Sequence, residues 1–253
     1  MLHLNPPIFG NNIFWITFGF KKDIRRCAIQ IEDILKSYVL PLGGGYNLST
    51  VTPVPDDADP EVPRIVFNSL HGFSQIVFNQ IGTTLNVGYS ADYAAANAAG
   101  KRKDYLLTRI RALHNILMEI ECTALISGVV SRVLFFTGDD ENKLRGFLPS
   151  FISEKYRPGP LYESIFRTVE ILDDKFCNII QISSYREMSA GLNPYSIPRV
   201  PARDSVKLGL ELIHDINDRY SYNENKNYFT SIEASENMLN RSEGLIQQFL
   251  GKF

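Results

Sequence analysis

The sequence predicts an α+β protein made of two similar halves, because one order of elements occurs twice along the chain. Residues 1–123 and residues 124–253 each read as a strand, a helix, three strands and a helix. Thr17-Phe18-Gly19 precedes the first helix, and Phe136-Thr137-Gly138 precedes its counterpart. Three consecutive strands with short turns pair antiparallel, so we expect two antiparallel sheets whose apolar faces are covered by helices. The two halves should pack together as one compact unit.

In the first half, changes of hydrophobic period separate strands from helices. Apolar residues alternate over residues 13–20, which is typical of a strand with one buried face. Residues 22–37 change to helical spacing, and this helix should end before Pro41 and the glycines that follow. The acidic, proline-rich segment 46–63 should form an exposed loop. The remaining elements are strands at residues 64–68, 74–80 and 83–89 and a helix at residues 104–120.

The second half repeats this order. Residues 129–137 are rich in β-branched and aromatic side chains, which favours a strand. Thr230 and Glu233 have the spacing of a capping box, which predicts the start of the last helix. The other elements are a helix at residues 140–151, a hairpin at residues 165–172 and 176–184, a strand at residues 207–217 and a final helix at residues 230–249.

Composition and charge restrict the compartment and the class of partner. With 253 residues, 44% of them hydrophobic and 21% charged, the chain resembles an average globular protein. The formal net charge of −2 gives no overall basic field to gather nucleic acid or acidic membranes. Three scattered cysteines (Cys27, Cys122 and Cys177) favour a reducing, cytoplasmic setting. No apolar run reaches the roughly 18 residues of a membrane span, and no secretory signal pattern opens the chain, so we expect neither membrane insertion nor secretion.

Both ends of the chain carry a family resemblance. Asn5-Pro6-Pro7-Ile8 and the strand that follows resemble the start of a sporadically distributed prokaryotic family of uncharacterised proteins of about this size. The strand at residues 207–217 and the final helix are similar to the end of that family. Phe9-Gly10-Asn11-Asn12 departs from it, because an extended apolar-acidic run is expected there. The resemblance implies no activity, cofactor or site residue, and the scattered occurrence of the family implies a mobile-element or host-defence setting.

A second, structural analogy concerns each half by itself. A curved antiparallel sheet that grips a long helix occurs in helix-grip proteins and in TATA-binding-protein-like halves. The predicted order of strands and helices is similar to theirs, so such a layer is one concrete form of each half.

The sequence lacks the common catalytic and metal-binding motifs. The glycine run at residues 43–45 follows a helix and lacks the Gly-Lys-Ser/Thr ending of a phosphate-binding loop. None of the four histidines is spaced as a metal-ligand pair, and no G-x-S-x-G elbow marks a hydrolase. We therefore expect neither a cofactor nor a metal.

His214 and Asp215 belong to the densest polar cluster of the sequence. A histidine beside a carboxylate has the chemistry of a general base or a metal ligand. In a strand the two side chains point to opposite faces, so one contiguous site would require a bulge or a strand end. The alternative is a strand that simply ends in a polar turn.

Two basic clusters open predicted helices. Cations at a helix N-terminus oppose the helix dipole, so neither cluster is placed for helix stability. If the two helices are neighbours, the clusters can form one basic patch for phosphates or an acidic partner. A solvated face balanced by the acidic loop is the alternative. The first cluster is Lys21, Lys22, Arg25 and Arg26, and the second is Lys101, Arg102, Lys103, Arg109 and Arg111. The candidate binding residues among them are Lys22, Arg25, Arg26, Lys101, Arg102 and Lys103.

Together these features favour a non-enzymatic binding or interaction protein that recognises another protein through its sheets. A homodimer is one form of this, because aromatic-rich faces are often completed by a second copy. The first alternative is a protein that holds a lipid or a nucleotide between a curved sheet and a helix. The second is an enzyme that uses the region of His214 and Asp215. Nucleic acid is only a minor hypothesis, because no basic strand interleaved with aromatic residues offers a stacking platform.

Overall fold

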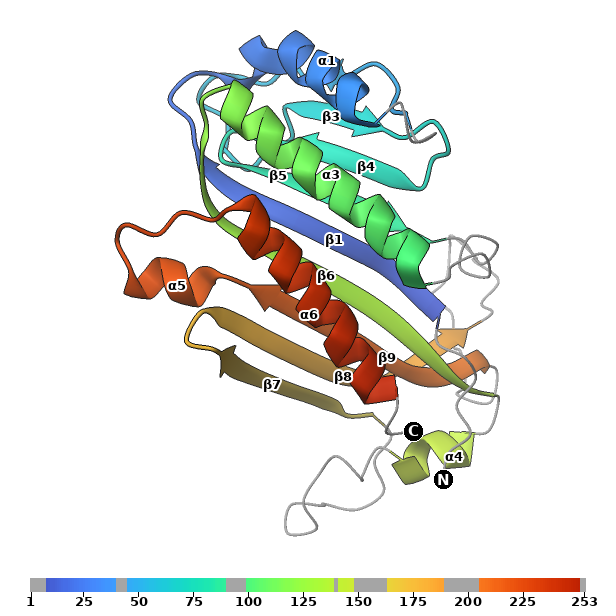
Figure 1. The fold of residues 1–253 in the computed structure, drawn as a ribbon. Coiled ribbons are helices and arrows are strands. Elements are labelled where there is room, and N and C mark those ends of the chain that lie inside the picture. The colour runs from blue at the N-terminus through green and yellow to red at the C-terminus, as the bar shows by residue number, and fades with distance from the viewer. Residues whose placement is uncertain are drawn as a thin grey trace.

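A computed structural model describes residues 8–39, 45–89, 99–138, 141–147, 163–188 and 205–250. These residues form one nine-stranded antiparallel sheet in the order β2-β3-β4-β5-β1-β6-β9-β8-β7 (Figure 1). The strands are β1 (Ile8–Gly19), β2 (Thr50–Val51), β3 (Ile65–Asn68), β4 (Ser74–Phe78), β5 (Gly82–Gly88), β6 (Thr123–Gly138), β7 (Ile165–Leu172), β8 (Phe176–Met188) and β9 (Ser205–Asn217).

The predicted fold class, two α+β halves with a sheet each, is wrong. β1 and β6, the first strand of each predicted half, pair antiparallel from Ile8 opposite Leu134 to Gly19 opposite Thr123. This pairing joins all described strands into one sheet, so the fold is β-rich. The physical reason is that two separate sheets would each expose a long strand edge with unpaired backbone groups. The predicted division after residue 123 falls inside β6, just after its first residue, and internal duplication stays a prediction.

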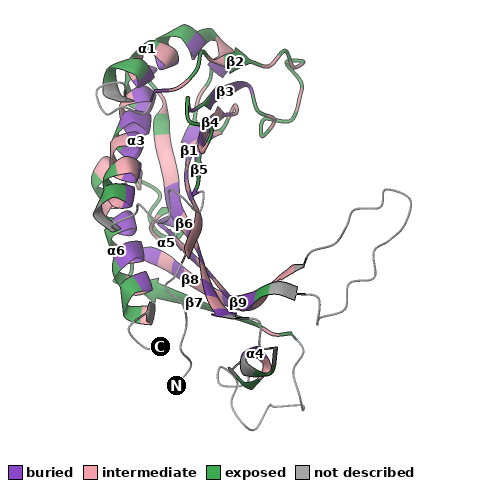
Figure 2. Cartoon of the chain, turned by 90° about the vertical axis from the view of Figure 1, so that its right-hand side faces the viewer, coloured by how far each residue is buried: buried purple, intermediate pink, exposed green. Residues whose placement is uncertain are grey.

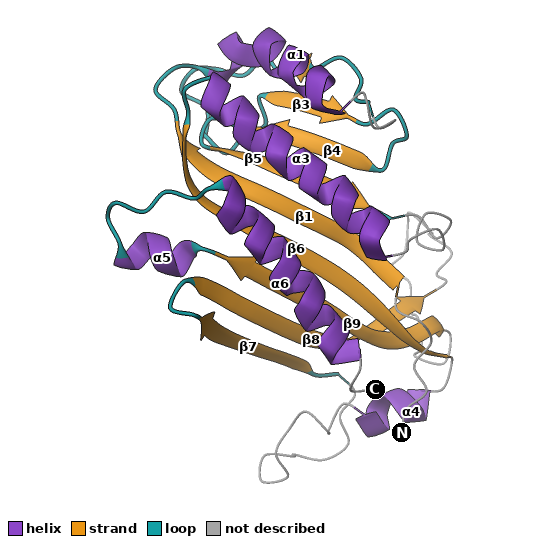
Figure 3. Ribbon diagram, in the orientation of Figure 1, coloured by secondary structure: helices purple, strands orange, loops and turns teal. Residues whose placement is uncertain are grey.

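The long helices lie on one side of the curved sheet and leave the other side open (Figures 2 and 3). α3 packs against α1, and α6 packs over β6 and β9. None of the described helices combines the length and the apolar composition needed to cross a bilayer. The described helices are the 3-10 helix η1 (Ile24–Cys27) and the α-helices α1 (Ala28–Val39), α3 (Ala99–Glu119), α4 (Glu141–Phe147), α5 (Arg219–Glu224) and α6 (Ile232–Leu250).

The core lies between the sheet and these helices, and the strand periodicity explains it. Phe14, Ile16 and Phe18 alternate along β1 and are at most 2% exposed, because every second side chain of a strand points to the same face. Burial of each such side chain stabilises the fold by about 1.5–3 kcal/mol. Phe9 packs against both the larger core cluster and a smaller one beneath the end of α6, and so joins them.

The start of α6 differs by one residue from the predicted capping box. The Ser231 hydroxyl accepts a hydrogen bond from the Ala234 N–H at 3.2 Å, so Ser231 caps the helix. The Thr230 hydroxyl instead lies 2.7 Å from the Ser127 hydroxyl inside the protein. Thr230, which the spacing predicted as the cap, thus contacts β6 instead. The predicted helix at residues 140–151 lies partly outside the described residues.

Candidate functional site

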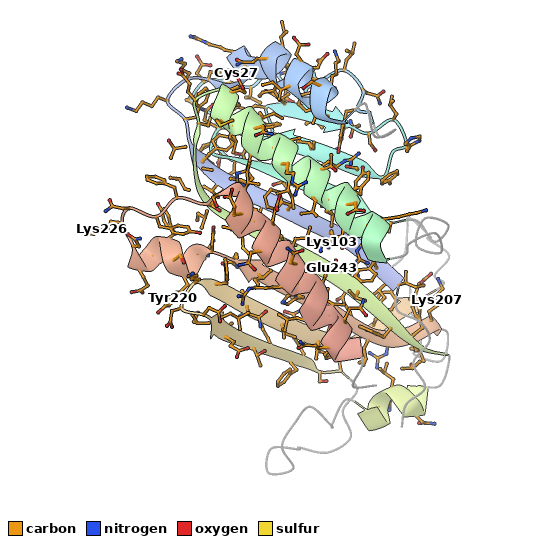
Figure 4. All side chains as sticks on the ribbon, viewed as in Figure 1. Cys27, Lys103, Lys207, Tyr220, Lys226 and Glu243 are labelled. Carbon is orange, nitrogen blue, oxygen red and sulfur yellow. The ribbon has the colours of Figure 1, made fainter. Side chains whose placement is uncertain are left out.

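The two basic clusters lie at opposite ends of the α1–α3 layer. The Gln30 side chain at the start of α1 donates to the Glu119 carbonyl at the end of α3 (3.1 Å), so the two helices run in opposite directions. The second cluster opens α3, which spans 21 residues, or about 30 Å. Cys27, beside the first cluster, and Lys103, in the second, lie far apart in Figure 4. Lys22, Arg25 and Arg26 therefore do not share a surface with the α3 cluster.

Arg102 is not a surface cation at all. Its side chain is 1% exposed, forms an ion pair with Glu243 of α6, and lies over the Phe9 ring. Lys101 is exposed and Lys103 is half-buried. The three candidate binding residues of the second cluster are thus two lysines and one buried link between α3 and α6.

His214 and Asp215 point to opposite faces of β9, and no bulge brings them together. His214 faces α6 and is 1% exposed. One ring nitrogen, Nδ1, lies 2.8 Å from the Ser242 hydroxyl, and the other, Nε2, lies 2.6 Å from the Asn178 side-chain oxygen. Both nitrogens are therefore occupied inside the core, which favours a structural histidine over a general base.

Hydrogen-bond directions fix the state of this histidine. The Asn178 oxygen can only accept, so Nε2 carries a hydrogen, and in the neutral ring Nδ1 then accepts from Ser242. Burial lowers the pKa of His214 to about 4, which agrees with a neutral ring. A second buried histidine, His114 of α3, lies 2.9 Å from the Ser235 hydroxyl, and burial lowers its pKa to about 4 as well.

We expect acid to destabilise the protein through these two histidines. The unfolded chain binds a proton to each near pH 6.5, whereas in the folded protein the pKa of His114 and of His214 is about 4. The unfolded state therefore binds more protons, and stability is lost as the pH falls from 6.5 toward 4. The loss is roughly 2 kcal/mol per histidine near pH 5. Urea denaturation of the wild type at neutral and mildly acidic pH measures it.

His214→Gln is the informative variant for this effect. It should lose about 2 kcal/mol less than the wild type on acidification, while His71→Gln, at an exposed position, should follow the wild type. Burial raises the pKa of Asp215, Asp218 and Glu243, so these carboxyl groups make the folded protein more stable as the pH falls. This contribution should be the same in the wild type and in both histidine variants. The same pH dependence in His214→Gln and in the wild type would contradict the assignment.

Asp215 belongs instead to the open face, the side of the sheet without long helices. Strand register places Val130, Asp215, Ile179 and Val169 in one row across β6, β9, β8 and β7. Burial raises the pKa of Asp215, although its carboxylate accepts a hydrogen bond from the Asn217 amide at 3.0 Å. The row ends at Val169 of β7, so Asp215 lies on the same face of the sheet as Val169 of this edge strand.

Aromatic side chains on the open face lie against the sheet itself. A Cβ at Gly128 of β6 would come within 2.6 Å of the Trp15 ring, so the missing side chain leaves the space in which the indole packs. Further along β6, the rings of Phe136 and Tyr185 meet edge to face at 5.9 Å. The Lys207 ammonium lies 5.7 Å from the centre of the Phe136 ring and pairs with Glu187. At this end of the open face, apolar rings lie beside a paired charge, that of Lys207 with Glu187.

The β7 edge is the most exposed apolar feature of the sheet. Ile165 is 65% exposed, Val169 55%, Ile171 39% and Phe166 36%, although the strand has only eight residues. No described strand pairs with its outer side. Natural sheets protect such edges with prolines, bulges or rows of charges, and this strand has only Arg167 and Glu170 as charged residues.

The opposite edge of the sheet is protected. β2 has two residues, and the following segment, residues 52–63, contains four prolines and four acidic residues. Proline cannot donate a ladder hydrogen bond and charges oppose strand addition. The contrast makes β7, rather than β2, the edge that is open to another strand.

Space for a lipid or nucleotide between sheet and helix is small. The cavity between β8, β9 and α6 measures about 10 Å³, enough for about one water molecule. A larger cavity of about 500 Å³ opens outside the core, where the β7–β8 turn meets α5 and the start of α6. The part of the chain that the structure describes contains no group of three or more His, Cys, Asp or Glu residues arranged to hold a metal ion, and its three cysteines are free.

The sequence indicated the β7–β8 hairpin but not the edge. The one signal of an exposed edge strand in the sequence was a series of large apolar residues in a short segment without proline or glycine. Such residues are usually buried, so this signal does not predict exposure. Searches against models of known protein families and against curated protein sequences give no match for this chain.

Proposed function

We propose that this chain is a non-enzymatic binding protein that adds a polypeptide strand to the β7 edge, and that the strand comes from a second copy of the chain. The supporting observation is the exposure of Ile165, Phe166, Val169 and Ile171 on an eight-residue edge strand. A strand that pairs there would satisfy backbone groups and cover these side chains in one step. The cytoplasmic location and the mobile-element or host-defence setting stay predictions.

A second copy suits this edge because self-pairing avoids charge repulsion. A two-fold axis perpendicular to the sheet keeps each face on its own side, so residues of the same parity meet across the interface. An antiparallel register centred on Thr168 places Ile165 opposite Ile171, and Arg167 opposite Val169. No like charges then lie directly opposite each other, which would destabilise the pair.

Lysine on the edge should dissociate this dimer. Ile165→Lys places a charge opposite Ile171, and Val169→Lys places one opposite Arg167, so we expect the dimer dissociation constant to rise about tenfold or more. Ile29→Lys is the matched control, because Ile29 is 79% exposed on α1, away from β7. Native mass spectrometry and light scattering over a concentration series measure the change.

Two results would overturn the proposal. A wild-type protein that stays monomeric at high micromolar concentration excludes the second copy as the occupant. A dimer that persists in both edge variants, or that weakens as much in Ile29→Lys, places the interface on another surface.

A further inference from the structure

A cavity of about 250 Å³ opens where the chain leaves β1, beside the β4–β5 turn and the residue that precedes β3. It lies at the end of the molecule that Cys27 marks in Figure 4. Five of its lining residues are cations and two are acids. The lining residues are Lys21, Lys22, Asp23, Arg25, Arg26, Asp56, Arg64 and Gln80.

Arg25 forms ion pairs with both acidic residues of the cavity, Asp23 and Asp56. Its backbone N–H donates to one Asp23 oxygen at 3.0 Å, and its Nε donates to the other at 2.8 Å. One terminal nitrogen pairs with Asp56 at 2.7 Å, and the other donates to the Val54 carbonyl at 2.7 Å. These contacts hold the pKa of Asp23 below its ordinary value. Among the described residues, none forms an ion pair with Lys21, Lys22 or Arg26, so their charges are not neutralised.

Arg64 is the inner cation of the cavity and the least compensated. The residue is 3% exposed, and its Nε has no hydrogen-bond acceptor within the described chain. The hydrogen bond recorded for its terminal nitrogens is a long one, 3.4 Å, to the Ala58 carbonyl. The Asp23 carboxylate attracts the Arg64 charge, but its oxygens are hydrogen-bonded to Arg25. A buried guanidinium without a hydrogen-bonded carboxylate is costly, and in proteins such groups are normally paired. An anion in the cavity would supply the missing partner.

The wall of the cavity is held in place by Gln80 and Asp23. The Gln80 amide donates to the Lys22 carbonyl at 2.7 Å, and its oxygen accepts from the Ile24 N–H at 3.3 Å. Asp23 caps η1 through the Arg25 N–H. The chain that carries the cations is thereby fixed to the β4–β5 turn, so little ordering is required when a ligand binds.

From this geometry we infer that the cavity binds the phosphate group of a small molecule, with Arg64 as the inner ligand and Lys21, Lys22 and Arg26 around it. A planar guanidinium fits two phosphate oxygens, and lysines supply further charge. Among the described residues, no aromatic side chain lines the cavity, so they offer a base no stacking surface and recognition is confined to the phosphate. This site is independent of the β7 edge.

Pyrophosphate is the probe for this site, and isothermal titration at about 0.15 M salt is the measurement. The wild type should bind it, and Arg64→Met should weaken binding about tenfold or more, because charged hydrogen bonds are lost. Lys22→Glu/Arg26→Glu should weaken it similarly. Lys101→Glu/Lys226→Glu, which changes the net charge equally at exposed positions elsewhere, should leave it within about twofold. No binding by the wild type at millimolar pyrophosphate, or equal loss in the control, overturns the site.

Two further readouts separate binding from folding and identify the ligand group. Arg64→Met should keep or increase its melting temperature without ligand, because it removes a buried charge that has no hydrogen-bonded carboxylate, and pyrophosphate should stabilise the wild type more than this variant. If Arg64→Met unfolds, the surface pair Lys22→Glu/Arg26→Glu still decides the question. ADP should compete with pyrophosphate and adenosine should not. Competition by adenosine would contradict recognition through the phosphate.

Discussion

Gly209→Ala should destabilise the protein by about 3 kcal/mol or more, although it adds a single methyl group. Gly209 lies in β9, opposite Phe136 of β6. A Cβ there would lie 2.0 Å from the Phe135 carbonyl oxygen and 2.8 Å from its carbon. Both are backbone atoms and cannot rotate away, so β6 and β9 would have to separate where Leu208 and Leu210 are buried. The free energy of unfolding in urea measures the cost.

The matched control is Gly244→Ala on the exposed side of α6. No heavy atom outside its own helix lies within 4 Å of a Cβ at this position. Alanine in a helix interior restricts the unfolded chain, so this variant should be more stable by about 0.5–1 kcal/mol. If Gly209→Ala were as harmless as Gly244→Ala, the close approach of β6 and β9 would not be a real constraint on the sheet.

The sequence predicted strands and helices well because hydrophobic period is a local property. The alternation at residues 13–20 marks β1, and the apolar stripe at residues 104–120 marks most of α3. Which strands pair is not local. β1 and β6 are separated by more than 100 residues. The alternation of apolar residues in each strand does not show whether the two strands pair with each other or form the edges of two separate sheets. The single sheet was therefore missed.

The contacts of individual polar side chains are not visible in the sequence for the same reason. Arg102 looks like a member of a surface cluster, yet its partner Glu243 is 141 residues away and belongs to another helix. Arg64 gives no signal as the single arginine that begins a predicted strand, because its burial depends on contacts with the preceding loop. Ser231 replaces Thr230 as the cap of α6 because Thr230 contacts β6. In each case a distant segment decides what a polar side chain does.

Arg102→Met should cost about 3–5 kcal/mol at neutral pH, because it leaves the Glu243 carboxylate in the core without its cation. Arg102 is 1% exposed, and the Glu243 side chain is 12% exposed. Burial raises the pKa of Glu243 even in the presence of Arg102, so loss of the arginine should raise it further. The penalty should therefore shrink as the pH falls, because the carboxyl group takes up a proton. Urea denaturation at neutral and acidic pH tests the magnitude and its direction.

The double variant Arg102→Met/Glu243→Leu should regain most of this loss, because two apolar side chains replace the ion pair and no buried charge is left. A coupling energy of about 2 kcal/mol or more in the double-mutant cycle would show that the two residues act as a unit. The exposed pair Lys207–Glu187 is the control cycle, and its coupling should stay below about 1 kcal/mol. If the losses at Arg102 and Glu243 add independently, apolar packing alone joins α3 to α6. If the double variant recovers most of the free energy of unfolding, the ion pair adds little net stability and instead determines how α3 and α6 pack against each other.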